Sequence, residues 1–278
     1  MGGREPCSEL KFCPLPTENC PMPAKSLIAR WLEPLVSGLW IFFLVWTAWI
    51  AAVWTFAIGD SVVAGWTGNR DLRAVLGWLI ASGDVAWIIL AAANVHLWLA
   101  ETEGLRTARR WALIVGGGGA ALAVASTLGG FPLGPIEYSR QLGMKFGPVP
   151  VGLPLLWFAL VIGARQTVLR CWAGVTHGQL AVATAALVLL TAAQLEPVAA
   201  KVRAWWFWRP IDPSQPPQFS PPWTNYAAWF LTALVLTYFL REDRVATRQR
   251  TTTPRPAMIF LLLNAVLLAT HLGRHWRG

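Results

Sequence analysis

The sequence predicts an all-α, polytopic integral membrane protein with about seven transmembrane helices in one bundle. The first observation is composition: 55% of the 278 residues are hydrophobic and only 13% are charged, whereas soluble domains carry about 25% charged residues. The second is length, because the apolar runs approach the roughly 20 residues that cross about 30 Å of hydrocarbon. The third is that glycine- and proline-rich segments break this pattern in two places on one predicted side of the membrane.

Seven apolar runs give the predicted spans in chain order. They cover residues 34–58, 76–99, 111–128, 149–167, 180–199, 223–240 and 257–272. The first run carries four tryptophans, and the second carries Asp84 in its middle. The third contains four consecutive glycines at 116–119. Such a run is typical of close helix packing, because glycine lets a neighbouring helix approach.

We expect a polar tail at residues 1–30, followed by one membrane helical domain at 31–278. The tail is rich in proline and cysteine, unlike the apolar core of a cleavable signal peptide. Cys7, Cys13 and Cys20 are separated by five and six residues, whereas zinc ligands usually lie about two to four residues apart. These spacings favour reduced thiols over a metal site.

The net charge of +9 does not indicate nucleic-acid binding, because Lys and Arg residues that flank membrane spans orient them. With seven spans, 14 of the 23 basic residues fall on the side that holds the N-terminal tail. Five arginines in the loop at 241–256 are the largest contribution. We therefore expect a protein of the bacterial inner (cytoplasmic) membrane with its N-terminus in the cytoplasm.

Two irregular segments, at residues 129–150 and 196–225, fall on the opposite side of the membrane from the tail. Their glycines and prolines preclude regular helix over these lengths. Irregular backbone at a membrane face must be covered by protein or must face water. We expect the two segments to form the floor or lid of a cavity.

Glu196 lies at the edge of the fifth run, and four consecutive aromatic residues follow at 205–208. A charged carboxylate is costly at this depth, so an ionisable residue here indicates a functional site. A carboxyl group in such a place is a candidate proton donor. The alternative is structural: Glu196 caps irregular backbone or pairs with Lys201 or Arg203.

Asp84, in the middle of the second run, is the other carboxyl group predicted within a span. If buried, it must be protonated or hydrogen-bonded. Asn94 and His96, candidate partners on its own helix, are nearly three turns or more away. A partner on another helix is therefore favoured.

Tryptophan is unusually abundant, with 18 residues against 3 tyrosines. Some tryptophans mark membrane interfaces, as indoles usually do, but others fall well inside the spans. The inner ones either face lipid and core or line a pocket for a long, flat, apolar ligand.

Short motifs follow one another in order through both irregular segments. The first set is Gly130-Phe131-Pro132-Leu133-Gly134, Tyr138, Leu142-Gly143-Met144-Lys145, Val149-Pro150 and Pro154-Leu155-Leu156-Trp157. The second set is Glu196-Pro197-Val198-Ala199, Trp206-Phe207-Trp208, Pro222-Trp223-Thr224-Asn225 and Trp229. With them, residues from roughly 85 to 240 resemble the membrane carotenoid biosynthesis family. That family contains the carotenoid hydratases, namely the bisanhydrobacterioruberin hydratases and the gamma-carotene 1',2'-hydratases.

The chain departs from the family pattern at four positions. Ala123 stands where the family usually has a glutamate, and Glu196 stands where it has an aspartate. Gly129 replaces a threonine, and Ile136 replaces a tyrosine.

The resemblance implies a hydratase that adds water to the terminal double bond of an acyclic carotenoid end, without any cofactor. Protonation of the alkene requires a carboxylic acid in an apolar pocket. Glu196 is the first candidate for this acid, and Asp84 is the second. Asp60 and Glu137 are candidates for the base or for the group that orients water.

Asn225 and Tyr138 are candidates for holding the water molecule. The candidate contacts for the polyene or the cation are Trp157, Trp206, Trp208, Trp229, Phe131 and Pro132. The expected partners are a carotenoid and membrane lipid, with no metal and no nucleic acid.

A second hypothesis is a non-catalytic carotenoid-binding subunit within a larger pigment complex of membrane proteins. Ala123 and the excess of tryptophan motivate it. A third, a transporter, lacks the inverted repeat of broken helices that such folds show.

Overall fold

The computed structural model describes residues 27–210, 214–240 and 253–276, with the side chains of residues 27–33 and of Asp60 excepted. The predicted tail up to residue 26, including Cys7, Cys13 and Cys20, lies outside the described residues. So does most of the basic loop predicted at 241–256.

Helices make up most of the described structure. They are α1 (Leu27–Thr55), α2 (Asp60–Trp66), α3 (Arg70–Glu103), α4 (Leu105–Gly129), α5 (Gly152–Cys171), α6 (His177–Pro197), α7 (Trp223–Phe239) and α9 (Arg255–His275). A π-helical turn, η2 (Val198–Val202), continues α6, and a 3-10 turn, η1 (Arg140–Leu142), lies between α4 and α5. Four short strands are β1 (Ile136–Tyr138), β2 (Lys145–Phe146), β3 (Val149–Pro150) and β4 (Trp206–Trp208).

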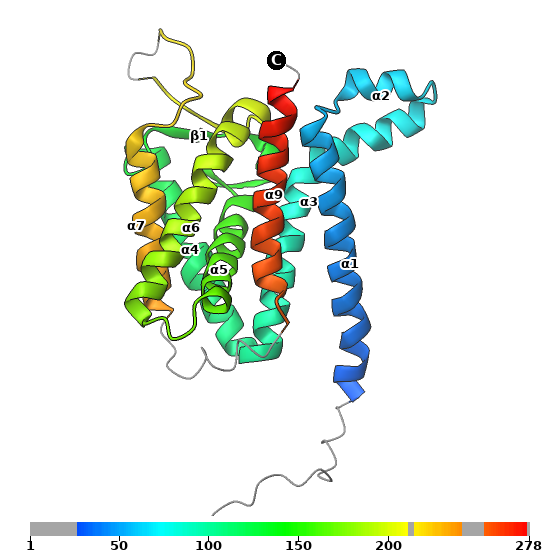
Figure 1. Ribbon diagram of the computed structural model, residues 1–278. Helices are drawn as coiled ribbons and strands as arrows, with labels where there is room; N and C mark the ends of the chain where they lie inside the picture. Colours follow the sequence, from blue (N-terminus) through cyan, green and yellow to red (C-terminus); the bar gives the residue numbers. More distant parts are fainter. Residues whose placement is uncertain (1–26, 211–213, 241–252, 277–278) are drawn as a thin grey trace, which may run out of the picture.

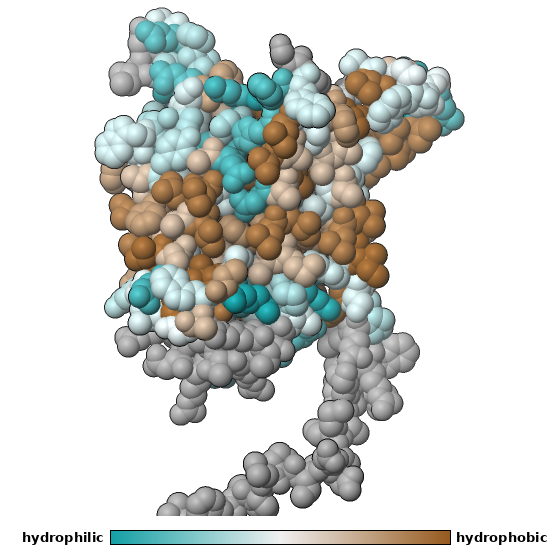
Figure 2. All heavy atoms as spheres, in the orientation of Figure 1, coloured by the Kyte–Doolittle hydropathy of each residue, from teal (hydrophilic) through white to brown (hydrophobic). Residues whose placement is uncertain are grey.

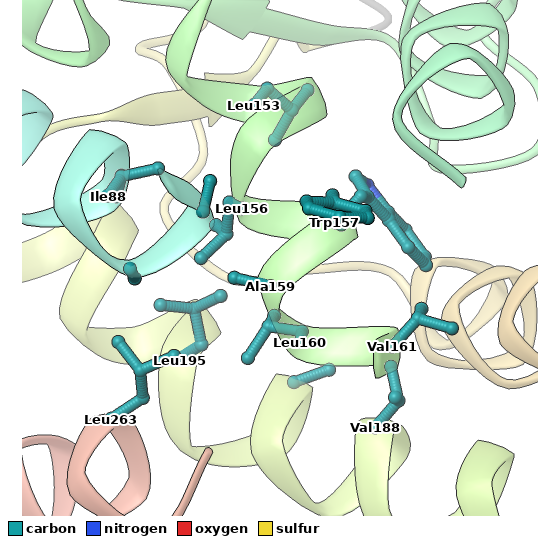
Figure 3. Packing of buried hydrophobic residues seen from close by; sticks show 14 of the residues in the cluster. Ile88, Leu153, Leu156, Trp157, Ala159, Leu160, Val161, Val188, Leu195 and Leu263 are labelled. Atoms are coloured by element: carbon teal, nitrogen blue, oxygen red, sulfur yellow. The ribbon is translucent and has the colours of Figure 1, made fainter. Parts of the chain in front are cut away.

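The long helices form one bundle in which successive long helices run in opposite directions (Figure 1). The chain enters α1 at one end of the bundle and leaves α9 at the other end (Figure 1). Helix α5 lies at the centre of the bundle, since 83% of its most apolar 18-residue stretch is buried inside the protein. Its side chains meet Ile88 of α3, Val188 and Leu195 of α6, and Leu263 of α9 (Figure 3).

Within the described residues, six helices are long and apolar enough to cross a membrane: α1, α3, α4, α5, α6 with η2, and α9. Figure 2 shows a band of hydrophobic side chains across the middle of the visible face. The protein is therefore an all-α, polytopic integral membrane protein, as predicted. The predicted count of seven spans is not confirmed, because α7 has 17 residues and reaches only about 26 Å at ~1.5 Å per residue.

Residues 59–75, which connect the first two predicted spans, hold α2 and the first turns of α3. Asn69 begins α3 as an N-cap, and its side chain accepts hydrogen bonds from the backbone N–H groups of Asp71 at 2.9 Å and Leu72 at 3.1 Å. Asparagine at this position satisfies N–H groups that have no partner within the helix. Helix α3 consequently extends beyond the predicted span at both ends.

The glycine run in α4 is a packing surface, as expected from its sequence. A Cβ atom at Gly119 would lie 2.4 Å from Cγ of Trp157 on α5. A Cβ atom at Gly118 would lie 2.6 Å from the side chain of Leu236 on α7. Gly117 has no neighbour within 4 Å of such an atom, so only part of the run is in close contact.

The two irregular segments meet at the same end of the bundle, as predicted. Strand β1 from the first segment pairs antiparallel with β4 from the second, with Ile136 opposite Trp208 and Tyr138 opposite Trp206. Strands β2 and β3 form a second small ribbon within the first segment. Together with the helix ends beneath them, these ribbons place residues from distant parts of the chain around Glu196.

Candidate functional site

Glu196 is buried at the end of α6, where only 1% of its surface is exposed. Its Oε1 atom accepts hydrogen bonds from Nδ2 of Asn225 at 2.5 Å and Nε1 of Trp229 at 2.8 Å. Its Oε2 atom accepts one from Nε1 of Trp206 at 2.8 Å. All three donors are neutral, so the predicted alternative of pairing with Lys201 or Arg203 is not what the structure shows.

Two elements bring these donors to Glu196. Asn225 and Trp229 lie four residues apart on α7 and therefore share one face of that helix. Trp206 begins β4, whose side chains alternate between the two faces of the ribbon. Its indole points inward with Trp208, which donates to the carbonyl oxygen of Leu133 at 2.9 Å.

A stacked pair of indoles lies beside the carboxyl group. Trp157 of α5 and Trp229 of α7 have ring centroids 4.3 Å apart and planes inclined by 16°. This arrangement depends on Gly119, because any side chain there would occupy the place of the Trp157 ring. The pair presents a large π surface next to a buried acid.

A small cavity of about 10 Å³ lies between these groups and is lined by Glu196, Asn225, Trp157, Trp229, Tyr138 and Leu133. This volume is close to the minimum that holds one water molecule. The Oδ1 atom of Asn225 is buried and has no hydrogen-bond partner in the described structure. The cavity is too small for a polyene end, so binding of one requires the lining side chains to move.

Tyr138 closes the cavity from the ribbon. Its ring makes an edge contact with Trp206, with centroids 6.1 Å apart. Burial, and secondly the carboxyl group of Glu196, raises the pKa of the Tyr138 phenol. The phenol therefore remains protonated and can donate a hydrogen bond into the cavity.

Asp84 forms a separate buried centre. It is fully buried in α3, and its Oδ2 atom accepts from Nε of Arg203 at 2.7 Å and Nε1 of Trp205 at 2.7 Å. Its Oδ1 atom accepts from Nε1 of Trp54 at 3.1 Å. The partner on another element was expected, but Arg203, Trp205 and Trp54 were not identified from the sequence.

Other predicted site residues lie away from Glu196. Glu137 is exposed on the outer face of β1, opposite to the buried face that carries Tyr138. Phe131 is 74% exposed, and Pro132 is half-buried beside it. Asp60 begins α2, and its side chain is outside the described residues. Within the described part of the chain, no cluster of three His, Cys, Asp or Glu side chains could hold a metal ion.

A family profile described as carotenoid biosynthesis protein matches residues 83–274. The chain belongs to the carotenoid biosynthesis protein family. This assignment confirms the resemblance found in the motifs, and the match includes both Asp84 and Glu196. Helices α1 and α2 precede the matched region.

A similar protein with an assigned activity is the bisanhydrobacterioruberin hydratase of Haloarcula japonica. It is 34% identical over 145 residues, which are 50% of this chain and 47% of the relative. The match thus spans about half the length of each carotenoid biosynthesis protein. No solved structure matches the chain significantly.

Proposed function

We propose that this carotenoid biosynthesis protein is a hydratase that adds water to the terminal carbon–carbon double bond of an acyclic carotenoid. The supporting observation is Glu196, a fully enclosed carboxyl group surrounded by neutral N–H donors and indole rings. An acid in an apolar pocket is what protonation of an unactivated alkene requires. The hydratase activity of the similar archaeal protein favours the same reaction.

In the first step, Glu196 transfers its proton to the inner CH carbon of the terminal double bond, so that the positive charge develops on the carbon that bears the two methyl groups. Among the described residues Oε1 accepts two hydrogen bonds and Oε2 accepts one, so Oε2 is the oxygen with room to carry the proton. The new C–H bond forms from the alkene π electrons and leaves a tertiary carbocation. The same three N–H donors stabilise the carboxylate that remains after transfer.

In the second step, water adds to the carbocation. The stacked rings of Trp157 and Trp229 stabilise the cation by their π faces. Asn225 Oδ1, which lacks a partner in the described structure, and the phenol of Tyr138 hold the water molecule. The water forms the C–O bond and returns its proton to Glu196, so atoms and charges balance.

This mechanism uses one carboxyl group as both acid and base. It therefore does not need the second acid that the family usually carries at the position of Ala123, which is fully buried in α4. Of the other candidates, Asp84 is paired with Arg203 and Glu137 faces outward. The expected membrane is the bacterial inner membrane, with the N-terminus in the cytoplasm because the basic residues favour that side.

The test is incubation of the purified full chain in lipid vesicles with lycopene, an acyclic carotenoid, in water enriched in oxygen-18. The expected product is heavier than lycopene by one water and carries the label on a tertiary carbon. Recovery of unaltered lycopene from folded protein would contradict the proposal.

The second candidate function is carotenoid binding without reaction, as a pigment subunit of a larger membrane complex. Ala123 favours it, because a carboxyl group usual in the family is missing. It predicts that protein purified from cells that make carotenoids carries pigment in a fixed molar ratio. The labelled product from lycopene would exclude it.

A further inference from the structure

Asp84 and Arg203 form a buried ion pair that lies outside the Glu196 cavity. The distance from Nε of Arg203 to Oδ2 of Asp84 is 2.7 Å, and the Asp84 side chain is fully enclosed while 15% of the Arg203 side chain is exposed. The indoles of Trp54 and Trp205 donate to the same carboxylate. Both carboxyl oxygens of Asp84 therefore have hydrogen-bond donors, one of them a cation.

The pair holds a strained turn. Ala204 follows Arg203 and has a φ angle of 49°, a left-handed conformation that residues with a side chain adopt only where surrounding contacts impose it. The backbone N–H of Trp205 donates to the carbonyl oxygen of Ala199 at 2.7 Å. Contacts on both sides of the turn at residues 203–206 therefore fix the direction in which the chain leaves η2.

This turn connects the two buried carboxylates. Trp205 donates to Asp84 at 2.7 Å, and the next residue, Trp206, donates to Glu196 at 2.8 Å. A displacement of the turn on the Asp84 side consequently moves the indole that contacts the proposed acid.

Helix α1 contributes to the same anchor from outside the region matched by the family. Besides the hydrogen bond from Trp54, Nε1 of Trp46 donates to the carbonyl oxygen of Gly83 at 2.9 Å. A Cβ atom at Gly83 would lie 3.0 Å from Ile50, so α1 and α3 are in close contact next to Asp84.

We propose that Asp84 and Arg203 are positioning residues: their ion pair fixes the turn at 203–206 and thereby holds the Trp206 indole against the carboxyl group of Glu196. Asp84 touches neither the cavity nor the reacting atoms. The inference rests on the proposed hydratase function. It gives Asp84, the second candidate acid, a structural role instead: Asp84 helps to keep Trp206 against Glu196.

The first experiment is a double-mutant cycle on purified full chain in vesicles with lycopene, using Asp84→Asn, Arg203→Gln and the double variant. Each single variant is expected to lower kcat about 10- to 100-fold, the scale of a misplaced catalytic group, while KM stays nearly constant. The double variant should be no slower than the worse single one, because the two residues act as a unit. Arg203→Lys should recover part of the loss.

The matched control is Asn264→Leu, which removes hydrogen bonds from Thr191 and Gln194 between α6 and α9. It is expected to lower thermal stability and to retain kcat. Losses that multiply in the double variant, or full kcat in both single variants, would overturn the inference.

The second experiment does not depend on turnover. Trypsin cleaves after Lys201 and Arg203, and the anchored turn should resist it in the native chain and in Asn264→Leu. Asp84→Asn should make this segment cleavable, and equal resistance in Asp84→Asn would contradict the anchor. If the native chain forms no product, the hydratase proposal fails, whereas the proteolysis result still decides whether the ion pair holds the turn.

Discussion

Trp205 and Trp206 are adjacent in the chain, yet their indole N–H groups donate to two different buried carboxylates, Asp84 at 2.7 Å and Glu196 at 2.8 Å. Adjacent strand residues point to opposite faces, so the start of β4 separates an ion-paired anion from a carboxyl group with neutral donors only. Asp84 is paired with Arg203, whereas Glu196 accepts from one amide and two indoles.

Gly119 should be essential for the stacked indoles. In Gly119→Ala the added methyl group overlaps the Trp157 ring, and overpacking of this kind costs about 1–3 kcal/mol. We expect a lower unfolding temperature in detergent together with a lower rate of lycopene hydration. The matched control is Gly117→Ala, which meets no neighbour within 4 Å and should be at least as stable as the native chain. Equal behaviour of the two variants would show that the contact with Trp157 is unimportant.

Asn225 should contribute to the reaction through both ends of its amide. Asn225→Leu removes a donor to Glu196 and the acceptor at Oδ1. A hydrogen bond to a charged group contributes about 1.5–3 kcal/mol, which corresponds to a loss of roughly 10- to 100-fold in kcat. The control is Asn94→Leu. Asn94 is also a buried asparagine, but its side chain donates to the carbonyl oxygen of Leu90. Unchanged kcat in Asn225→Leu would remove Asn225 from the mechanism.

The orientation can be tested with cysteine labelling. Cys171 is exposed at the end of α5, on the side assigned to the cytoplasm together with the three cysteines of the tail. A maleimide that does not cross membranes should leave the native chain unlabelled in spheroplasts. The variant Gln141→Cys, exposed in the first irregular segment, should be labelled. Labelling of the native chain without disruption of the membrane would reverse the orientation.

Local sequence patterns predicted the class of fold and the meeting of the two irregular segments. Apolar runs identify the helices because a helix that crosses the hydrocarbon of a membrane needs apolar side chains along its length. The two irregular segments meet as expected because both lie at the same end of the bundle. Glu196 was singled out because a charged carboxylate is energetically costly at the edge of a membrane span. Ala123, Glu196 and the motif order are properties of short stretches of chain, which a single sequence displays directly.

Pairwise relationships were beyond the reach of the same patterns. The ion pair of Asp84 with Arg203 joins residues 119 positions apart, and nothing local distinguishes Arg203 from Lys201 as the partner. Glu137 lies beside Tyr138 in sequence but on the other face of β1, since successive side chains of a strand point to opposite faces. The α2 helix was missed because it is short and glycines stand before and after it. Asn69, by contrast, is an N-cap residue from which the start of α3 could have been predicted.

The most direct test of the account compares Glu196→Gln with Glu137→Gln in the oxygen-18 hydration assay with lycopene. Loss of a positioned general acid costs about 10²- to 10⁴-fold, so Glu196→Gln should form almost no labelled product at native protein levels. Glu137→Gln, whose side chain is on the exposed face, should retain the native rate. Labelled product formed at the native rate by Glu196→Gln would contradict the central claim that this buried carboxyl group is the acid.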